Sequence, residues 1–214
     1  MNYKLLSYLL IIILAVNILF TANMYFKNSR VLYALQEQNA LKKEQTTESL
    51  RHGMLVELLM DNIKMYYRYE NKMINDFDIL NIKGEKMRFS SLLDESYRII
   101  FKFSSKNCSS CIDAELKVIM KIADQIDPEK IIILSDGQGM RQLVAFIRER
   151  NLKIPIYRIS QGSEISILEQ ENVPFVCLMN ESLRTELLFI PIKELNGFSE
   201  QYYYNTIIPR FINK

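Results

Sequence analysis

The stretch IIFKFSSKNCSSC, residues 99–111, decides the fold. A strongly apolar run is followed by a short polar loop and then by two cysteines with two serines between them. The apolar run predicts a buried strand, and the sequence after Cys111 has the periodicity of an amphipathic helix. A Cys-x-x-Cys pair between a strand and a helix is typical of a redox dithiol.

The start of a helix favours a reactive thiol, because unpaired N–H groups and the positive end of the helix dipole stabilise a thiolate. Cys108 is therefore expected to attack a disulfide of a partner protein, and Cys111 to resolve the mixed disulfide. A structural disulfide and half of a zinc site remain alternatives. Zinc usually takes four ligands, and only Cys177 and His52 are left for it. We therefore predict no metal and no cofactor.

The rest of the C-terminal part alternates short apolar runs with helical patterns, which predicts an α/β fold with a mixed sheet and flanking helices. Strands are predicted at 77–82, 87–89, 99–103, 130–134, 154–159, 173–179 and 183–192. Helices are predicted from the cysteines to residue 127 and at 140–151, 163–171 and 196–211, with a helical turn capped by Ser90.

The first 26 residues have a different composition. No charged residue lies between Leu5 and Phe26, and a helix of this length spans about 33 Å, enough to cross a bilayer. We predict a membrane anchor over residues 1–26. A cleaved signal peptide would need small residues at its cleavage site, which Phe20-Thr21-Ala22 matches poorly, and a buried soluble helix would show a polar face.

Residues 27–73 alternate leucines and charges at helical spacing, which predicts a helical stalk. Residues 45–48 contain threonine followed by glutamate, which favours the start of a second helix there. A coiled-coil dimer through this stalk is the alternative, although Asn39 interrupts its heptads. The predicted domains are thus the anchor, the stalk and an α/β domain over residues 74–214.

Residues 75–212 resemble the thioredoxin superfamily, and within it the membrane-anchored thiol-disulfide oxidoreductases of the TlpA/ResA type. Three segments carry the resemblance: the hairpin lead-in of residues 76–92, the strand, loop and cysteine pair of residues 101–111, and the segment Asn172–Val176. The resemblance implies a thioredoxin-like sheet and a dithiol site at Cys108 and Cys111.

The resemblance also implies a cis peptide bond at Pro174, which would turn the Val173 backbone toward the sulfurs to pair with an extended client peptide. Two residues depart from the family pattern. Asn107 stands where the family usually has tryptophan, and Lys102 stands where thioredoxin carries a buried acid.

Lys102 requires an explanation, since a lysine within a covered strand needs an acidic partner or a route to water. It either snorkels or pairs with an acid such as Glu115, or it approaches Cys111 and lowers the pKa of that thiol. Cys177 is expected to be a buried, inert thiol, and the tyrosines at 202–204 to pack the last helix.

The predicted function is a membrane-anchored, extracytoplasmic (periplasmic) thiol-disulfide oxidoreductase that reduces exported proteins. Its partners would be protein clients and a thiol electron donor. The net charge of +2 and the lack of a basic patch exclude nucleic acid. Basic residues after the anchor favour the opposite orientation, but an exported pair would act where disulfides form. A redox-inactive binding module with a structural disulfide and a peroxiredoxin-like peroxidase are the alternatives.

Overall fold

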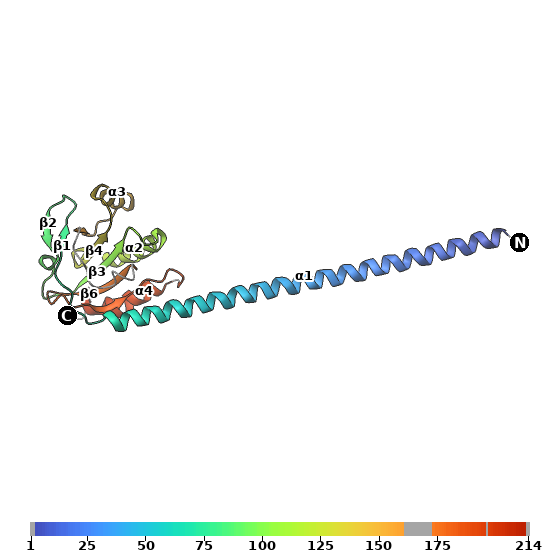
Figure 1. The fold of residues 1–214 in the computed structure, drawn as a ribbon, viewed down its shortest axis with the longest axis horizontal. Helices are drawn as coiled ribbons and strands as arrows, with labels where there is room; N and C mark the ends of the chain where they lie inside the picture. The colour runs from blue at the N-terminus through green and yellow to red at the C-terminus, as the bar shows by residue number, and fades with distance from the viewer. Residues whose placement is uncertain (1–2, 161–172, 196, 213–214) are drawn as a thin grey trace. The chain divides into compact units, whose positions relative to one another are not determined.

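The computed structural model describes residues 3–160, 173–195 and 197–212 (Figure 1). It divides into two compact units, residues 1–56 and residues 57–214, and each is described by itself. The helix predicted at 163–171 lies outside the described residues.

Helix α1 (Tyr3–Tyr69) is one continuous helix of 67 residues (Figure 1). The prediction of a second helix starting near residue 45 is wrong, because the Thr46 and Thr47 hydroxyls donate to the carbonyls of Lys42 and Lys43 in the preceding turn. A threonine hydroxyl that bonds to the carbonyl four residues back lies inside a helix and does not cap a new one.

Within the described residues, no helix combines the length and the apolar character needed to cross a membrane. The anchor predicted over residues 1–26 is therefore not supported by the structure.

The second unit contains a mixed sheet of seven strands in the order β2-β1-β5-β4-β3-β6-β7. The strands are β1 (Asp78–Leu80), β2 (Lys86–Arg88), β3 (Arg98–Ser104), β4 (Ile131–Asp136), β5 (Ile156–Ile159), β6 (Phe175–Met179) and β7 (Glu186–Phe189). Strand β3 lies parallel to β4 and antiparallel to β6. The predicted mixed sheet is confirmed, with the strand before the cysteines inside it.

The predicted hairpin is also confirmed, because β1 pairs with β2 in antiparallel register. Ser90 does not cap a helix as expected. It lies inside the short 3-10 helix η1 (Phe89–Leu92), and its N–H and hydroxyl donate to the Asp76 carboxylate at 2.9 and 2.7 Å. These bonds tie the end of the hairpin to its start.

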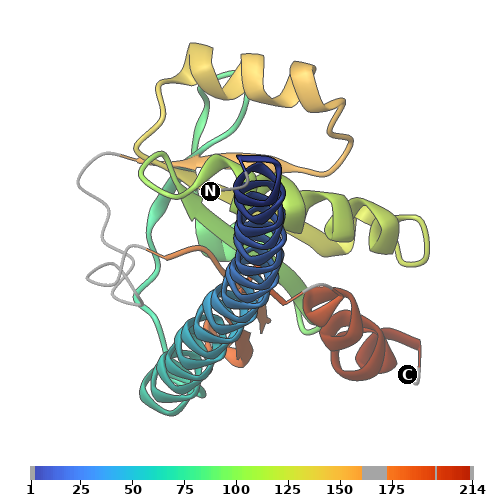
Figure 2. The same cartoon turned by 90° about the vertical axis from the view of Figure 1, so that its right-hand side faces the viewer.

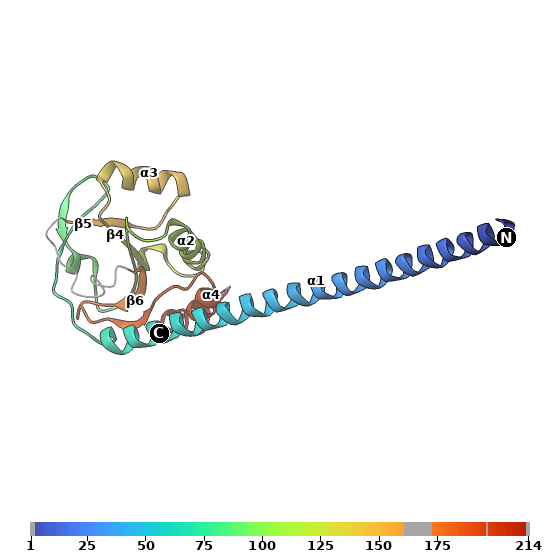
Figure 3. The ribbon, with the colours of Figure 1, turned by 45° about the vertical axis from the view of Figure 1, so that its right-hand side comes forward.

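Helices cover one face of the sheet. They are α2 (Ser109–Ala123), α3 (Met140–Arg150) and a C-terminal segment of α4 (Phe198–Tyr202), the π-helical η3 (Tyr203–Ile207) and α5 (Pro209–Ile212), with a short 3-10 turn η2 (Pro128–Lys130) before β4. Figure 3 shows α2, α3 and α4 on the same side of the strands, and Figure 2 shows the C-terminal segment, in red, beside α2, in green. The helix predicted at 196–211 is thus split into three pieces.

Strand β3 is buried on both faces. Phe101 and Phe103 pack with residues of α2, including Ile112 and Leu116. Ile100, which the alternation of the strand places on the opposite face, belongs to a second apolar cluster. This cluster contains residues of β1, β6 and η1 and is contacted by the last turns of α1. Burial on both faces explains why this strand is a continuous apolar run rather than an alternating one.

Candidate functional site

The loop between β3 and α2 is held by its own polar groups. The Ser104 N–H donates to Asn107 Oδ1 at 2.6 Å, and the Asn107 N–H donates to the Ser104 carbonyl at 3.0 Å. These reciprocal bonds close a tight turn that ends at Cys108. Asn107, at the position where the resembled family has tryptophan, therefore shapes the approach to the first cysteine.

A second loop supports this turn from the side of β4. The Ser105 N–H donates to the Asp136 carbonyl at 2.9 Å. Gly137 follows with φ of +74°, and a Cβ there would lie 2.6 Å from Ser105 Oγ. Glycine permits both the left-handed backbone and the close approach of the two loops.

The two predicted catalytic cysteines lie one helical turn apart at the start of α2. Cys108 is the N-cap residue, and its carbonyl accepts from the N–H groups of Cys111 and Ile112 at 3.1 Å each. Both are free thiols, with Cys108 exposed and Cys111 partly buried. The sulfur expected to attack is thus the more accessible one.

The surroundings of the two thiols separate their pKa values. A hydrogen bond from Ser110, whose Oγ lies 3.0 Å from Cys108 Sγ, is the largest cause that lowers the pKa of Cys108 from 9.0 to about 6. Hydrogen bonds from Cys111 and the positive charge of Lys193 add to it. Burial, followed by the interaction with Cys108, raises the pKa of Cys111 to about 11. At neutral pH the site therefore holds a thiolate at Cys108 and a protonated thiol at Cys111.

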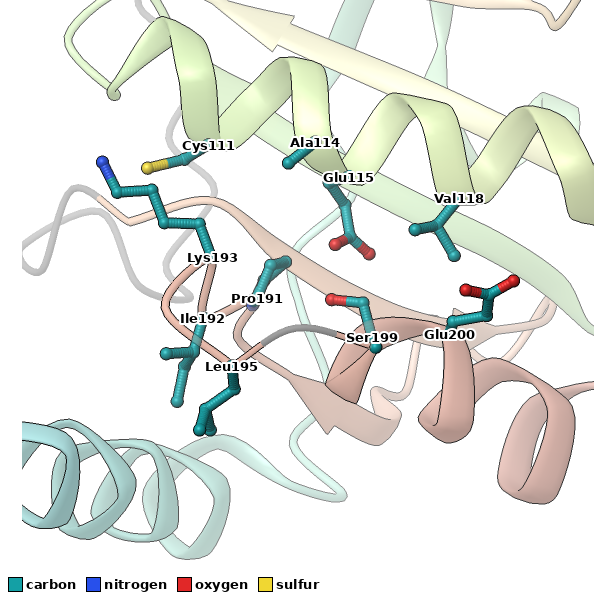
Figure 4. A pocket seen from close by; sticks show the side chains of 11 residues that line it. Cys111, Ala114, Glu115, Val118, Pro191, Ile192, Lys193, Leu195, Ser199 and Glu200 are labelled. Atoms are coloured by element: carbon teal, nitrogen blue, oxygen red, sulfur yellow. The ribbon is translucent and has the colours of Figure 1, made fainter. Parts of the chain in front are cut away.

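Sequence reasoning missed Lys193. Its Nζ lies 3.6 Å from Cys108 Sγ and 3.5 Å from Ser110 Oγ. Figure 4 shows its side chain reaching toward the sulfur of Cys111 from the segment after β7. Lys193 is 85 residues from Cys108 in the chain, so no local spacing could have indicated this contact.

A cavity of about 110 Å³ lies beside Cys111, between α2 and the segment that carries Lys193 (Figure 4). Glu115, one turn after Cys111, lines it and is only 2% exposed. Its carboxylate accepts a hydrogen bond from the Tyr203 hydroxyl at 2.7 Å. Burial raises the pKa of Glu115, against the hydrogen bonds from Ser199 and Tyr203 that lower it. A carboxyl group whose pKa is raised by burial thus lines the same cavity as the resolving thiol.

Lys102 does not pair with Glu115. Its register partners Leu134 and Phe175 belong to the apolar cluster on the other face of the sheet from α2, whereas Glu115 on α2 bonds to Tyr203. The alternation of β3 was predicted correctly, but the partner was assigned to the wrong face. That Lys102 tunes the pKa of Cys111 stays a prediction.

Pro174 is not a cis-proline, because the described residues contain no cis peptide bond. The expectation from the resemblance is wrong here. The trans form of an X-Pro bond is favoured by about 0.5–1 kcal/mol, and the next residue, Phe175, is fixed in the ladder opposite Lys102. The pairing of Val173 with a client peptide stays a proposal.

The other residues singled out in the sequence are Cys177, the C-terminal tyrosines and His52. Cys177 is fully buried in β6, as predicted, and burial raises the pKa of its thiol far above the usual range. That this thiol is inert stays a prediction. Tyr203 is buried and Tyr202 stacks on Phe189 with ring centroids 4.2 Å apart, so these two tyrosines do pack the end of the chain. Tyr204 is exposed, so the prediction is wrong for this tyrosine. His52 is exposed on α1.

No protein-family model matches the chain, and no curated protein matches it. Among solved structures it is similar to a thiol:disulfide interchange protein from a Bacteroides species, with a TM-score of 0.51, 16% identity, and coverage of 68% of this chain and 91% of the other. The fold is thioredoxin-like.

Two further structures are similar. One is described as a thiol:disulfide interchange protein from Chlorobium tepidum, with a TM-score of 0.50, 10% identity, and coverage of 66% of this chain and 97% of the other. The other is the thioredoxin domain of a Bacteroides vulgatus thiol-disulfide oxidoreductase, with a TM-score of 0.48, 12% identity, and coverage of 62% and 96%. At 10% and 16% identity, the two structures with TM-scores of 0.50 and 0.51 establish the fold alone.

Replacing Ser110 tests the main source of thiolate stability. Ser110→Ala removes the closest hydrogen bond to Cys108 Sγ, so the pKa of Cys108 should rise by about half to one pH unit. The rate of Cys108 alkylation by iodoacetamide near pH 6 should then fall roughly two- to fivefold. Ser109→Ala is the matched control and should keep the original rate profile. Equal profiles for both variants would contradict the assigned role of Ser110.

Replacing Glu115 tests how the burial of its carboxyl group makes the free energy of unfolding depend on pH. Because burial raises the pKa of Glu115 in the folded protein, its carboxyl group loses its proton at a higher pH than the usual value of 4.5. The free energy of unfolding should therefore fall as pH rises from the unfolded pKa through the folded one. Glu115→Gln keeps an acceptor for Tyr203 but does not titrate, so this decline should flatten. Urea unfolding between about pH 4 and pH 8 measures it, and Glu200→Gln, in the same cavity, should retain the decline.

Proposed function

We propose that this protein is a thiol-disulfide oxidoreductase in which Cys108 and Cys111 form the catalytic dithiol. One observation carries the proposal: an exposed thiol at the start of α2 lies beside Ser110 and Lys193, one turn from a second, less exposed thiol. The thioredoxin-like fold is consistent with it, although a fold alone does not establish an activity.

The first step is attack by the Cys108 thiolate on one sulfur of a client disulfide. A bond forms between Cys108 Sγ and that sulfur, the client S–S bond breaks, and the second client sulfur leaves as a thiolate. A nucleophile with a pKa near the ambient pH is the most effective in this exchange. A pKa of about 6 places Cys108 close to that optimum.

The second step releases the client. Cys111 passes its proton to the departed client thiolate and attacks Cys108 Sγ, and the remaining client sulfur leaves as a thiolate. The client gains two electrons, and the protein ends with a Cys108–Cys111 disulfide. A thiol donor then reduces this disulfide by the same two exchanges in reverse.

Insulin reduction tests the activity. The reduced protein should reduce insulin disulfides, and Cys108→Ser should abolish the reaction because the attacking sulfur is lost. Cys111→Ser should accumulate a mixed disulfide through Cys108, detected by mass spectrometry, because the resolving sulfur is lost. Cys177→Ala is the control and should retain activity, since that thiol is buried.

Two outcomes would contradict the proposal. Consumption of hydrogen peroxide by Cys108 without insulin reduction would favour a peroxidase. A Cys108–Cys111 bond that resists dithiothreitol, together with no exchange, would favour a binding module with a structural disulfide.

We also propose, from the uncharged stretch between Leu5 and Phe26, that the protein is attached to a membrane with its dithiol domain outside the cytoplasm, among exported client proteins. A membrane-impermeant maleimide tests this, since Cys108 is exposed. Cys108 should be labelled in intact cells, or in spheroplasts where an outer membrane blocks the reagent. Labelling that requires lysis of the inner membrane would contradict the proposal, and Cys108→Ser provides the blank.

A further inference from the structure

The segment that carries Lys193 is held in place by buried side chains on either side of Pro191. It leaves β7 at Phe189 and passes through Ile190 and Ile192, whose side chains are buried with 7% and 6% exposure. Figure 4 shows Ile192 pointing away from Cys111 while Lys193 points toward it. The exposed ammonium group therefore sits on a backbone whose neighbouring side chains are fixed in the core.

One helix residue holds this backbone directly. Asn62 Nδ2 donates to the Ile190 carbonyl at 2.6 Å, across 128 residues of sequence. Pro191 follows at once, and proline fixes its own φ and restricts the residue before it. Because Ile190–Pro191 is a stiff dipeptide, a bond that fixes the Ile190 carbonyl also fixes the direction in which the chain continues to Lys193.

The end of the same helix holds β7. The Glu70 carboxylate accepts from the N–H groups of Leu187 and Leu188 at 2.8 and 2.9 Å. Leu187 has φ of +51° at an irregularity in the pairing of β6 and β7, and a left-handed backbone is unfavourable for leucine because its Cβ crowds the following carbonyl oxygen. Hydrogen bonds to a carboxylate are among the stronger ones. The two bonds to Glu70 therefore offset the unfavourable backbone conformation of Leu187 and hold β7 against the end of α1.

Apolar packing supports the same contact. Met65 and Tyr69, on the last turns of α1, pack against the cluster that contains Leu188 and Ile190. Thr185 Oγ1 adds a hydrogen bond to the Tyr69 carbonyl at 2.7 Å. Residues 57–70 therefore contact β7 and the segment after it at several points, and Asn62 makes the contact nearest in sequence to Lys193.

We infer that Asn62 is a positioning residue: through the Ile190 carbonyl it holds the segment after β7 so that the Lys193 ammonium group stays beside the Cys108 sulfur. This role rests on the proposed function, because it matters only if Cys108 reacts as a thiolate. It also makes the conformation of the last turns of α1 a determinant of Cys108 reactivity.

The experiment compares Asn62→Ala with Asp61→Ala. Asp61 is the adjacent residue, its side chain is 50% exposed, and its carboxylate pairs with Lys64. The readout is the rate of Cys108 alkylation by iodoacetamide as a function of pH, with the modified cysteine identified by mass spectrometry. Asn62→Ala should lower the rate near pH 6 roughly two- to threefold, as loss of a cation near the thiolate would. Asp61→Ala should leave the rate unchanged.

Lys193→Met provides the decisive comparison. If Asn62 acts through Lys193, then Lys193→Met should lower the rate by a similar factor, and the combined variant should show no further loss. Full additivity of the two effects, or an unchanged rate in Asn62→Ala, would overturn the inference. Asn62→Asp, which keeps the size of the side chain but removes the donor, should reproduce Asn62→Ala if the alanine variant folds poorly.

The inference and the proposed function fail in different ways. If the unaltered protein alkylates with the pH profile of an ordinary thiol and does not reduce insulin, the proposed function is wrong. If Cys108 reacts as a thiolate near pH 6 and Asn62→Ala leaves that profile unchanged, only the positioning role of Asn62 is wrong.

Discussion

Burial of β3 between two apolar layers is the constraint on which the site depends. Phe101 and Phe103 are held by the helical layer and Ile100 by the opposite cluster, so the strand cannot shift by one residue without reversing every side chain. The end of this fixed strand leads into a short turn, closed by Ser104 and Asn107, and the turn leads directly into α2. The position of Cys108 is therefore set by the core.

The two sulfurs differ because the same helix turn gives them different surroundings. Cys108, at the cap, meets hydroxyl, N–H and ammonium groups that stabilise a negative charge. Cys111, on the inner side, meets buried surface and the charge of its neighbour, both of which oppose ionisation. Nothing in the Cys-Ser-Ser-Cys spacing alone assigns these roles. They follow from which side of the helix faces the cavity and which faces solvent.

The sequence predicted the parts of this protein that depend on local pattern: the hairpin, the mixed sheet and the cysteine pair between strand and helix. It did not predict Lys193 or the contacts of Asn62 and Glu70 with the chain around β7, because these groups are 85 to 128 residues apart from their partners. Glu115, named as an example of an acidic partner for Lys102, was the wrong example, because alternation gives two faces but not which face α2 covers. The helix break at 45–48 was wrong because threonine also bonds within a helix.

The groups around Cys108 also bear on the direction of electron flow. Ser110 and Lys193 stabilise the thiolate, and a thiolate exists only in the reduced pair. Stabilising the reduced form makes a disulfide more oxidising, so these contacts weaken the dithiol as a reductant. Strained or exposed disulfides have higher potentials than buried structural ones. A reductase with this site would therefore act on strained or exposed disulfides of its clients and leave their stable structural disulfides intact.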